Sequence, residues 1–509
     1  MPVETELKLR ISPGQLAKLK RHALLKSHQL TRPTTHRLYN IYFDTPKLEL
    51  NQSGMALRLR RSGKQWLQTL KGGGSVQGGL HQRNEWEMPV RGPALDFSLP
   101  QVEEWKDILP KHLRKKLQPV FVTDFSRNSR MLEWQGAQIE LCMDQGDVST
   151  EKTRAPICEL ELELISGEPQ QLFGLALAIL DIVPFELESI SKAEQGFRLM
   201  AGYTEHPLKA LPSRLDKHED LSKAMQTLIW SCLQHLQSNL RGMMRSDQTE
   251  YLHQMRVALR RLRILLRLAE KVCADEQLAG FRQEIVAIGN MLGRIREWDV
   301  LIAQTVQPIC DRMPEDVGLQ ALLSRSKLQR NISYRALCND ALVRELQRLL
   351  LHFSIWMYGP YWHRHEFSSL RTRDFAASYL PELARRFEKA GEHLNSLDAA
   401  QLHAMRIRAK KLRYSVEFFS SLYVKKKTHQ FLASLSEVQE VFGRINDNAV
   451  AQRLLDELSA TQALSGHQNT IGMVKGWVAH DFTGRLIVLK DAVRHFHKQY
   501  RYRGKYIWI

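Results

Sequence analysis

Charged and apolar residues alternate one by one in several short segments of the first 200 residues. Near the start, the side chains of Glu4, Glu6 and Lys8 point one way, and those of Leu7 and Leu9 point the other. The same alternation recurs over residues 55–61, 65–71, 85–88, 138–144 and 158–164. A period of two residues is typical of a β-strand that buries one face. The pattern therefore predicts an antiparallel, strand-rich α+β domain.

Helices are expected between these strands, near residues 12–24, 100–116 and 170–181. The strand over residues 65–71 is expected to end at Lys71, because the glycine-rich stretch over residues 72–79 predicts a flexible loop.

From about residue 219 onward, apolar residues recur at spacings of three and four, which predicts helices. Pro207 and Pro212 mark a plausible linker before them. The expected organisation is a tunnel domain over 1–203, a linker over 204–217, a helical domain over 218–500 with halves 218–365 and 366–500, and a tail over 501–509.

Composition separates the two parts of the chain further. The 509 residues carry a formal net charge of +18. Residues 1–205 contribute +2 and residues 206–509 contribute +16. A strongly basic helical body attracts polyanions, such as nucleic acid, anionic lipid or polyphosphate.

Some classes of protein are excluded. No apolar run reaches the length of a membrane-spanning helix, and the first residues lack a signal-peptide pattern, so no membrane association is expected. The six cysteines lie far apart without a C-x-x-C pair, which disfavours a zinc site and fits a reducing cytoplasm.

The charges on the strands are segregated by sign. Arg58 and Arg60 form a purely basic set, and Glu159, Glu161 and Glu163 form a purely acidic one. For a single strand, a solvated face would explain such residues. Three like charges on one face repel, however, and a bound Mg²⁺ or Mn²⁺ would relieve that repulsion. Arginines and lysines suit a phosphate ligand, so a sheet that closes on itself would give one lumen with a metal wall and a phosphate wall.

The segment Glu4-x-Glu6-x-Lys8 resembles the E-x-E-x-K signature of the CYTH family, the triphosphate tunnel metalloenzymes. It is followed in order by Tyr42-Phe43-Asp44-Thr45, Leu57-Arg58-Leu59-Arg60, Thr69-Leu70-Lys71, Arg83-x-Glu85-x-Glu87, Arg127 or Arg130, Glu140 to Asp144, the Glu159–Glu163 strand, and Ser191-Lys192. The resemblance implies an eight-stranded, closed, antiparallel β-barrel with flanking helices that binds triphosphates together with a divalent metal.

Roles follow from this resemblance together with the chemistry of the side chains. The residues expected to hold phosphate oxygens are Lys8, Arg58, Arg60, Lys71, Arg127, Arg130 and Lys192. The expected ligands of Mg²⁺ or Mn²⁺ are Glu4, Glu6, Asp144, Glu159, Glu161 and Glu163, and the catalytic set is Glu4, Glu6, Lys8, Glu161 and Glu163. Which glutamate of the acidic strand touches the metal directly stays open, and Glu85 and Glu87 are alternatives that would orient arginines.

The helical part contains an internal duplication with an offset of 150 residues. The segment His253–Arg263 matches His403–Arg413, and Leu292–Ile295 matches Phe442–Ile445. Two blocks with one offset predict two similar helical bundles related by a pseudo-twofold axis. Met255, Leu259, Leu262 and Leu266 would form the core stripe of the first copy.

The basic residues of each copy share one helical face. The two expected faces comprise His253, Arg256, Arg260 and Arg263, and His403, Arg406, Lys410 and Arg413. Together they would line one basic groove between the halves. The blocks resemble the CHAD domain, an all-helical module that is associated with polyphosphate binding, over about residues 218–500. Protonation of the two histidines is expected to strengthen anion binding at mildly acidic pH.

The function favoured by the sequence is a metal-dependent inorganic triphosphatase that hydrolyses tripolyphosphate, with a helical domain that binds inorganic polyphosphate. The first alternative is an adenylate cyclase or another organic triphosphate hydrolase, acting on ATP or thiamine triphosphate. The second is a non-enzymatic scaffold for polyphosphate or RNA. The basic and aromatic tail alone gives little support for nucleic-acid binding, and the sequence does not fix the oligomeric state.

Overall fold

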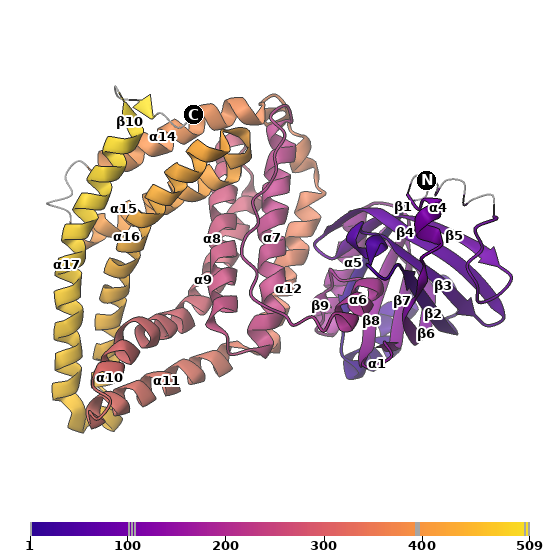
Figure 1. Cartoon of the computed structure of the whole chain (residues 1–509), viewed down its shortest axis with the longest axis horizontal. Coiled ribbons are helices and arrows are strands. Elements are labelled where there is room, and N and C mark those ends of the chain that lie inside the picture. Colours follow the sequence, from indigo (N-terminus) through magenta and orange to yellow (C-terminus); the bar gives the residue numbers. More distant parts are fainter. Residues whose placement is uncertain are drawn as a thin grey trace. The chain divides into compact units, whose positions relative to one another are not determined.

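The computed structural model describes residues 3–99, 102, 105, 108–391, 398–502 and 505–506. The chain divides into two compact units (Figure 1). The first comprises Met1–Glu205 together with Asp340–Gly359, and the second comprises His206–Asn339 together with Pro360–Ile509. One helix from the middle of the basic half of the sequence thus belongs to the unit that contains the strands.

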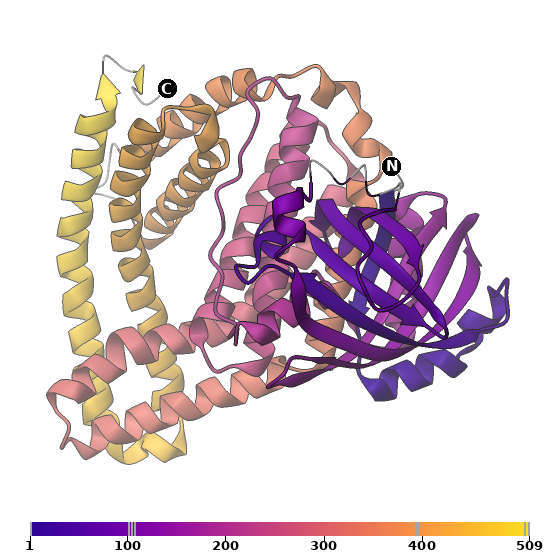
Figure 2. The ribbon, with the colours of Figure 1, turned by 45° about the vertical axis from the view of Figure 1, so that its right-hand side comes forward.

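The first unit is built around a closed barrel (Figure 2). Its strands are β1 (Val3–Arg10), β2 (Thr34–Asp44), β3 (Ala56–Ser62), β4 (Gln65–Gln77), β5 (Leu80–Val90), β6 (Gln118–Trp134), β7 (Ala137–Ser149) and β8 (Arg154–Ser166). Their order is β5-β4-β3-β2-β6-β7-β8-β1, and an antiparallel β1–β5 pairing closes the ring. The short β9 (Glu186–Leu187) adds to β1. The predicted eight-stranded antiparallel barrel is therefore confirmed.

The strand register decides which side chains enter the barrel. Lys8 pairs with Glu161, while its neighbour Leu7 pairs with Leu162. Because successive side chains point to opposite faces, the ionic row lines the lumen and the leucine row faces outward. Leu7 and Leu162 are fully buried, beneath the helix α5 (Pro169–Ile182) that packs on β1 and β8. Each such leucine contributes about 1.5–3 kcal/mol to folding.

The expected end of the fourth strand at Lys71 is wrong. β4 continues to Gln77 through the glycines, and its register with β5 shifts between Gly72 and Ser75. Gly73 and Gly74 have φ of +69° and +91°, and a Cβ at Gly74 would lie 1.9 Å from the carbonyl oxygen of Gln82. The glycines therefore make a β-bulge rather than a loop, because only glycine fits this conformation so close to a neighbouring strand.

The other helices of the first unit are α1 (Pro13–Arg21), α2 (Ala23–Ser27), α3 (Glu49–Gln52), α4 (Lys111–Arg114), α6 (Lys192–Met200) and α12 (Asp340–Met357). The single helix expected over 12–24 is split at His22, which is extended with φ −71° and ψ 148°. The helix expected over 170–181 is confirmed as α5. Of the helix expected over 100–116 only α4 is present, since residues 100, 101, 103, 104, 106 and 107 lie outside the described residues.

α6 fills one end of the barrel. Its residues Ala193 and Phe197 pack with the rings of Tyr42 and Phe121 in one buried cluster. A Cβ at Gly196 would lie 2.1 Å from the ring of Phe121, so a glycine is required for this close approach. Because α6 closes this end, its first residue, Lys192, lines the lumen.

The second unit is helical. Its α-helices are α7 (Leu221–Arg245), α8 (Thr249–Val272), α9 (Glu276–Leu301), α10 (Gln307–Arg312), α11 (Val317–Leu337), α13 (His365–Ser368), α14 (Thr372–Gly391), α15 (Ala399–Phe419), α16 (Lys425–Ser459) and α17 (Gln468–Tyr500). A π-helical turn occupies Ile302–Val306, and short 3-10 helices occupy Pro360–His363, Ser420–Leu422 and Gln462–His467. The short strands β10 (Arg501–Tyr502) and β11 (Lys505–Tyr506) pair with each other. Among the described helices, none offers an apolar stretch of the length that a bilayer crossing requires.

The duplicated segments occupy equivalent helices. The histidine-containing segments lie on α8 and α15, and the glycine-containing segments lie on α9 and α16, which pack against them. The predicted core stripe of α8 is buried, with Met255 and Leu262 fully inaccessible. Side-chain carboxylates of Asp220, Asp275 and Asp398 cap the N-termini of α7, α9 and α15.

Candidate functional site

The barrel lumen holds a cavity of about 550 Å³ whose walls are ionic. Its cationic lining residues are Lys8, Arg58, Arg60, Lys71, Arg83, Arg127 and Lys192. Its carboxylate lining residues are Glu4, Glu6, Glu85, Glu87, Glu140, Glu161 and Glu163. The two sets match in number, so the lumen is formally neutral. It can accept a cation and an anion together, whereas either one alone would leave a buried imbalance.

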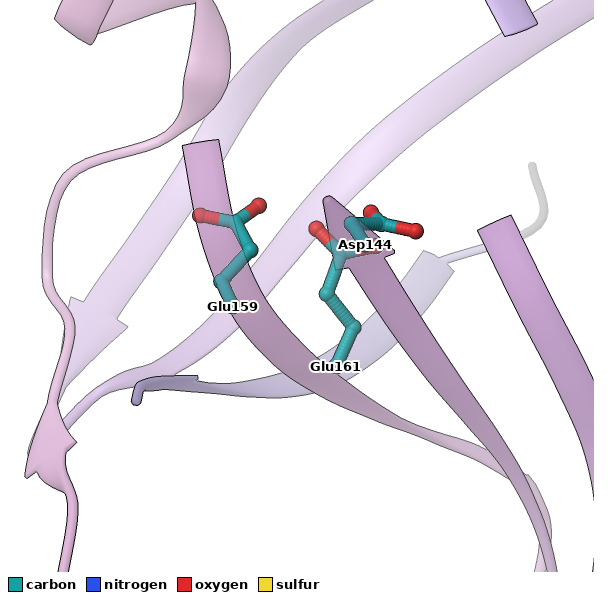
Figure 3. A group of neighbouring side chains, drawn as sticks. All are labelled: Asp144, Glu159 and Glu161. Atoms are coloured by element: carbon teal, nitrogen blue, oxygen red, sulfur yellow. The ribbon is translucent and has the colours of Figure 1, made fainter. Parts of the chain in front are cut away.

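Three carboxylates from adjacent strands converge at the plugged side of the lumen (Figure 3). Asp144 of β7 and Glu159 and Glu161 of β8 are buried, and their nearest oxygens lie within 4.8 Å of one another. This is a spacing that a metal ion could use. The ammonium group of Lys192 already lies among them, with Nζ 2.7 Å from Asp144 Oδ2 and 2.9 Å from Glu161 Oε1.

Two further cations neutralise this group. Arg127 donates two hydrogen bonds to Asp144, of 2.8 and 2.6 Å, and also contacts Glu161. Lys8 contacts Glu161 and lies 2.9 Å from Glu6 Oε1. Burial alone would raise the pKa of Glu161, but Lys192, Lys8 and Arg127 outweigh it and hold the pKa well below its ordinary value. The cations thus lower the pKa of Asp144 and Glu161, whereas burial raises the pKa of Glu159, the third carboxylate beside Lys192.

A second acidic group at the lumen wall is compensated only in part: Glu4 pairs with Lys71 and Glu6 with Lys8, but their neighbour Glu163 pairs with neither. Burial, and then the charges of Glu4, Glu6 and Glu140, raise the pKa of Glu163 to about 7. Within the part of the chain that the structure describes, neither Glu163 nor Glu140 has an ion pair. Carboxylates crowded without a cation are the donor set that a hard divalent ion prefers. Of the two acidic groups, this one fits a metal better.

The opposite wall carries Arg60, a cation that has no acidic partner among the described residues. Arg60 donates a 2.9 Å hydrogen bond from Nε to Asn40 Oδ1, and Asn40 in turn donates to Thr123 at 2.9 Å. Burial, and then the neighbouring Arg58 and Arg127, lower the pKa of Arg60 to about 10. Among the described residues no carboxylate pairs with Arg60. An anion with several oxygens would relieve this crowding of guanidinium groups.

Two other predicted phosphate ligands are shared with acidic partners. Arg58 lies 3.4 Å from Glu85 and 3.8 Å from Glu87. Lys71 lies 2.5 Å from Glu4 and 3.1 Å from Glu85. Glu85 thus holds both cations at the lumen wall, which agrees with the alternative role of orienting basic side chains.

Arg130 does not join the site. It pairs with Leu141, which belongs to the outward-facing leucine row, and its guanidinium donates to Asn128 at 3.0 Å. Arg127 and Arg130 are three residues apart on one strand, so they point to opposite faces. The placement of Arg130 therefore gives no support for a phosphate-binding role.

Arg83 lines the lumen but was not among the residues predicted from the sequence to bind phosphate. Its position in the same two-residue alternation as Glu85 and Glu87 could have indicated this placement.

The duplicated basic faces of the second unit do meet. Burial, and then the charges of Arg260, Arg406 and Arg256, lower the pKa of Lys410 to about 6. Burial and Arg260 likewise lower the pKa of Arg256 to about 10, with a smaller effect from Arg406. The four cations Arg256, Arg260, Arg406 and Lys410, from α8 and α15, are called the basic cluster below.

Local contacts fix the basic cluster. Arg256 donates to the carbonyl of Gly289 at 2.7 Å, and Arg406 donates to Asn446 Oδ1 at 3.0 Å. A Cβ at Gly293 would lie 2.7 Å from Arg256 Nη1, so the glycine of the repeated Gly-Arg-Ile segment makes room for this side chain.

The remaining residues of the predicted basic faces behave differently. Arg413 pairs with Glu417 at 2.7 Å, and the charges that act on Arg263 are those of Arg267 and Arg282 rather than the basic cluster. Burial, and then Arg296, lower the pKa of His253 to about 4. This lowered pKa gives no support to the expectation that His253 becomes protonated at mildly acidic pH, because burial first and the surrounding cations second disfavour a positive charge there. His403 lies exposed on α15.

These features define a closed antiparallel barrel with an inward-facing ionic lumen, joined in one chain to an all-helical basic domain. Comparison with protein families places each part. Residues 2–197 match the CYTH domain, and residues 227–456 match the CHAD domain. The chain therefore contains a CYTH domain followed by a CHAD domain.

Known relatives agree with this division. The inorganic triphosphatase of Haemophilus influenzae is 34% identical over 202 residues, which cover 38% of this chain and 54% of that protein. The chain thus matches only about half the length of this relative. The crystal structure of the CHAD domain from the plant Ricinus communis is 29% identical, covers 59% of this chain and 99% of that chain, and superposes with a TM-score of 0.51.

Proposed function

We propose that the chain is a metal-dependent inorganic triphosphatase that hydrolyses tripolyphosphate to pyrophosphate and phosphate inside the barrel. The observation that carries the proposal is the neutral lumen, in which equal numbers of cations and carboxylates line one cavity. A divalent metal offsets part of the negative charge of a triphosphate, so the two together disturb that balance less than the bare anion does. The similarity to the Haemophilus influenzae triphosphatase supports the same class of substrate.

The residues proposed to hold the metal are Glu4, Glu6 and Glu163, with Glu161 at their border. The raised pKa of Glu163 supports this choice, because burial and the nearby carboxylates of Glu4, Glu6 and Glu140 cause it and a bound cation would relieve their repulsion. Asp144 and Glu159 are better explained as partners of Lys192 than as ligands. A divalent ion bound to this set would polarise phosphoryl oxygens and lower the pKa of a coordinated water.

The cations of the chain are proposed to bind and orient the phosphates. Arg60 is available without breaking an existing ion pair, and Arg58 and Lys71 can share their charge between Glu85 and the substrate. Hydrolysis transfers the terminal phosphoryl group to water and releases pyrophosphate. Negative charge spreads over the nonbridging oxygens in the transition state, so fixed guanidinium and ammonium groups stabilise it.

The alternatives predict different lumen chemistry. An ATP cyclase or a thiamine triphosphatase needs a surface that receives an organic ring. Among the described lining residues, Tyr42 supplies the one aromatic ring, and its hydroxyl is already hydrogen-bonded to Arg58. A non-enzymatic anion scaffold leaves the crowding of carboxylates around Glu163 without a role. Both features favour hydrolysis of an inorganic substrate.

Phosphate release from tripolyphosphate, ATP and thiamine triphosphate tests this proposal. The full chain is the correct material, because residues 1–205 lack α12 of the same compact unit. Tripolyphosphate should have the highest kcat/KM with Mg²⁺ or Mn²⁺, and EDTA should reduce turnover to background. A preference for ATP or thiamine triphosphate would transfer support to the organic alternatives, and absence of all turnover would support the scaffold.

The proposed ligand of the helical domain is inorganic polyphosphate, bound at the basic cluster. Replacing Arg256 and Arg406 together by alanine should weaken binding of long-chain polyphosphate by about tenfold or more, since each lost charged hydrogen bond costs roughly 1.5–3 kcal/mol. The salt dependence of binding should become less steep, because fewer counterions are released.

Calorimetry or filter binding at several salt concentrations measures both effects. The matched control replaces Arg267 and Arg408, which lie exposed on the same two helices and carry the same charge. An equal loss in both double variants would show a general charge effect and reject the basic cluster as the site.

A further inference from the structure

Helix α12 belongs to the barrel unit although its sequence lies inside the stretch that matches the CHAD domain. It packs against α5, which covers strands β1 and β8. Gln347 of α12 is 1% exposed, and its Oε1 accepts a hydrogen bond of 3.0 Å from the backbone N–H of Leu187 in β9. A side chain from the CHAD-matched stretch thus contacts the backbone of β9. The chain continues from β9 to Lys192, which lines the lumen.

The segment that contains Leu187 is held on both sides. The N–H of Glu188 donates to the carbonyl of Lys8 at 2.8 Å. The carbonyl of Glu188 accepts from His81 at 3.1 Å, and its side chain accepts from the N–H of Ile190 at 3.1 Å. Two residues later the chain enters α6, where Lys192 extends into its group of carboxylates.

His81 makes this attachment independent of pH in the ordinary range. It is 1% exposed, and burial, and then the charge of Lys8, lower its pKa to about 3. The imidazole is therefore neutral. Because its Nε2 faces a carbonyl oxygen, this nitrogen carries the proton and donates it.

We propose that Gln347 is a positioning residue for the tunnel, acting through residues 187–191 on Lys192. This inference rests on the proposed function. Of the contacts that fix the segment, the one from Gln347 comes from a helix that lies within the CHAD-matched stretch of the sequence. Without it the segment loses the hydrogen bond from the N–H of Leu187 to α12 and gains freedom just before α6 begins. Lys192 then no longer holds Asp144 and Glu161 in one fixed arrangement.

A double-mutant cycle tests the proposal in the full chain. Gln347→Met, which keeps the length but removes the acceptor, should lower kcat/KM for tripolyphosphate by about five- to tenfold, as expected for one lost hydrogen bond. Lys192→Met should lower it further. The double variant should be no slower than Lys192→Met, because both changes act through one group. Multiplicative losses would overturn the proposal.

The control is Arg348→Ala on the same helix. Arg348 pairs with Asp181 at 2.9 Å near the surface, so this variant perturbs α12 without touching β9. Its kinetics should match the unchanged chain. If it loses as much kcat/KM as Gln347→Met, general docking of α12 and not the contact from Gln347 is responsible, and the proposal fails.

Hydrogen exchange read by mass spectrometry separates this inference from the proposed function. Gln347→Met should speed exchange at residues 187–192, and Arg348→Ala should not. If the unchanged chain shows no tripolyphosphate turnover, the proposed function fails while this comparison still decides the structural role. Unchanged exchange in Gln347→Met would reject the positioning role even in an active enzyme.

Discussion

Replacement of Glu161 by glutamine is expected to reduce tripolyphosphate turnover by about a hundredfold or more, the size typical for loss of a fixed electrostatic group in an active site. Glu161 contacts Lys8, Arg127 and Lys192 at once. A neutral amide cannot hold three cations, so the charges that should face the phosphates would repel and separate. The loss should appear in kcat as well as in kcat/KM, because alignment and binding both depend on this carboxylate.

Folding must be measured beside activity. Removing one member of a buried ionic group costs roughly 3–5 kcal/mol, so thermal unfolding should show a lower midpoint. Glu161→Asp keeps the charge and should retain more activity than Glu161→Gln. The matched control is Glu194→Gln, which removes a surface pair with Arg198 at 2.9 Å. A folded Glu161→Gln variant with less than about threefold loss would contradict the central role of Glu161.

The alternation of charged and apolar residues was enough to predict most of the barrel. Once the sheet closes, the two-residue period places Glu6, Arg60 and Glu161 on the inner face without further assumptions. Arg58 and Arg60 remain on one strand and Glu161 and Glu163 on another, but residues of opposite sign from other elements join each set. These features are local in the sequence, because each strand displays its own inner and outer faces.

The sequence did not predict which charged side chains from different strands and helices pair with one another. Asp144, Glu159 and Glu161 looked like metal ligands, and only the fold brings Lys192 among them from a helix that closes the barrel end. Arg130 shows a smaller limit. The motif alone does not show whether the side chain of Arg130 points into the barrel or outward. The register of β6, which contains both Arg127 and Arg130, decides this.

Backbone geometry and long-range packing account for the other differences. The glycines after Lys71 indicated a loop, since composition does not distinguish a flexible turn from a bulge in a continuing strand. The assignment of α12 to the barrel unit has no local signal, because its apolar face is equally suited to a helical bundle. Tertiary packing decides such cases.

Metal binding should depend on pH near neutrality. The pKa of Glu163 is raised to about 7, so the proton is retained below that pH and must leave before the carboxylate can bind a cation. Apparent Mn²⁺ affinity should therefore fall about tenfold per pH unit below pH 7 and level off above it, as expected for release of one proton. Glu163→Gln should weaken Mn²⁺ binding and remove this pH dependence.

Calorimetric titration with Mn²⁺ between pH 6 and pH 8, in buffers of different ionisation enthalpy, measures the affinity and the released proton together. Glu133→Gln is a suitable control, because Glu133 lies exposed near the end of β6. A flat pH profile in the unchanged chain would show that Glu163 does not compete with the metal for a proton.

The most direct test is a crystal structure of the full chain with Mn²⁺ and tripolyphosphate, with the metal located by its anomalous scattering. We predict a Mn²⁺ peak beside Glu4, Glu6 and Glu163, with phosphate density against Arg58 and Arg60. Mn²⁺ in the place of the Lys192 ammonium, or both ligands bound outside the barrel, would contradict the account.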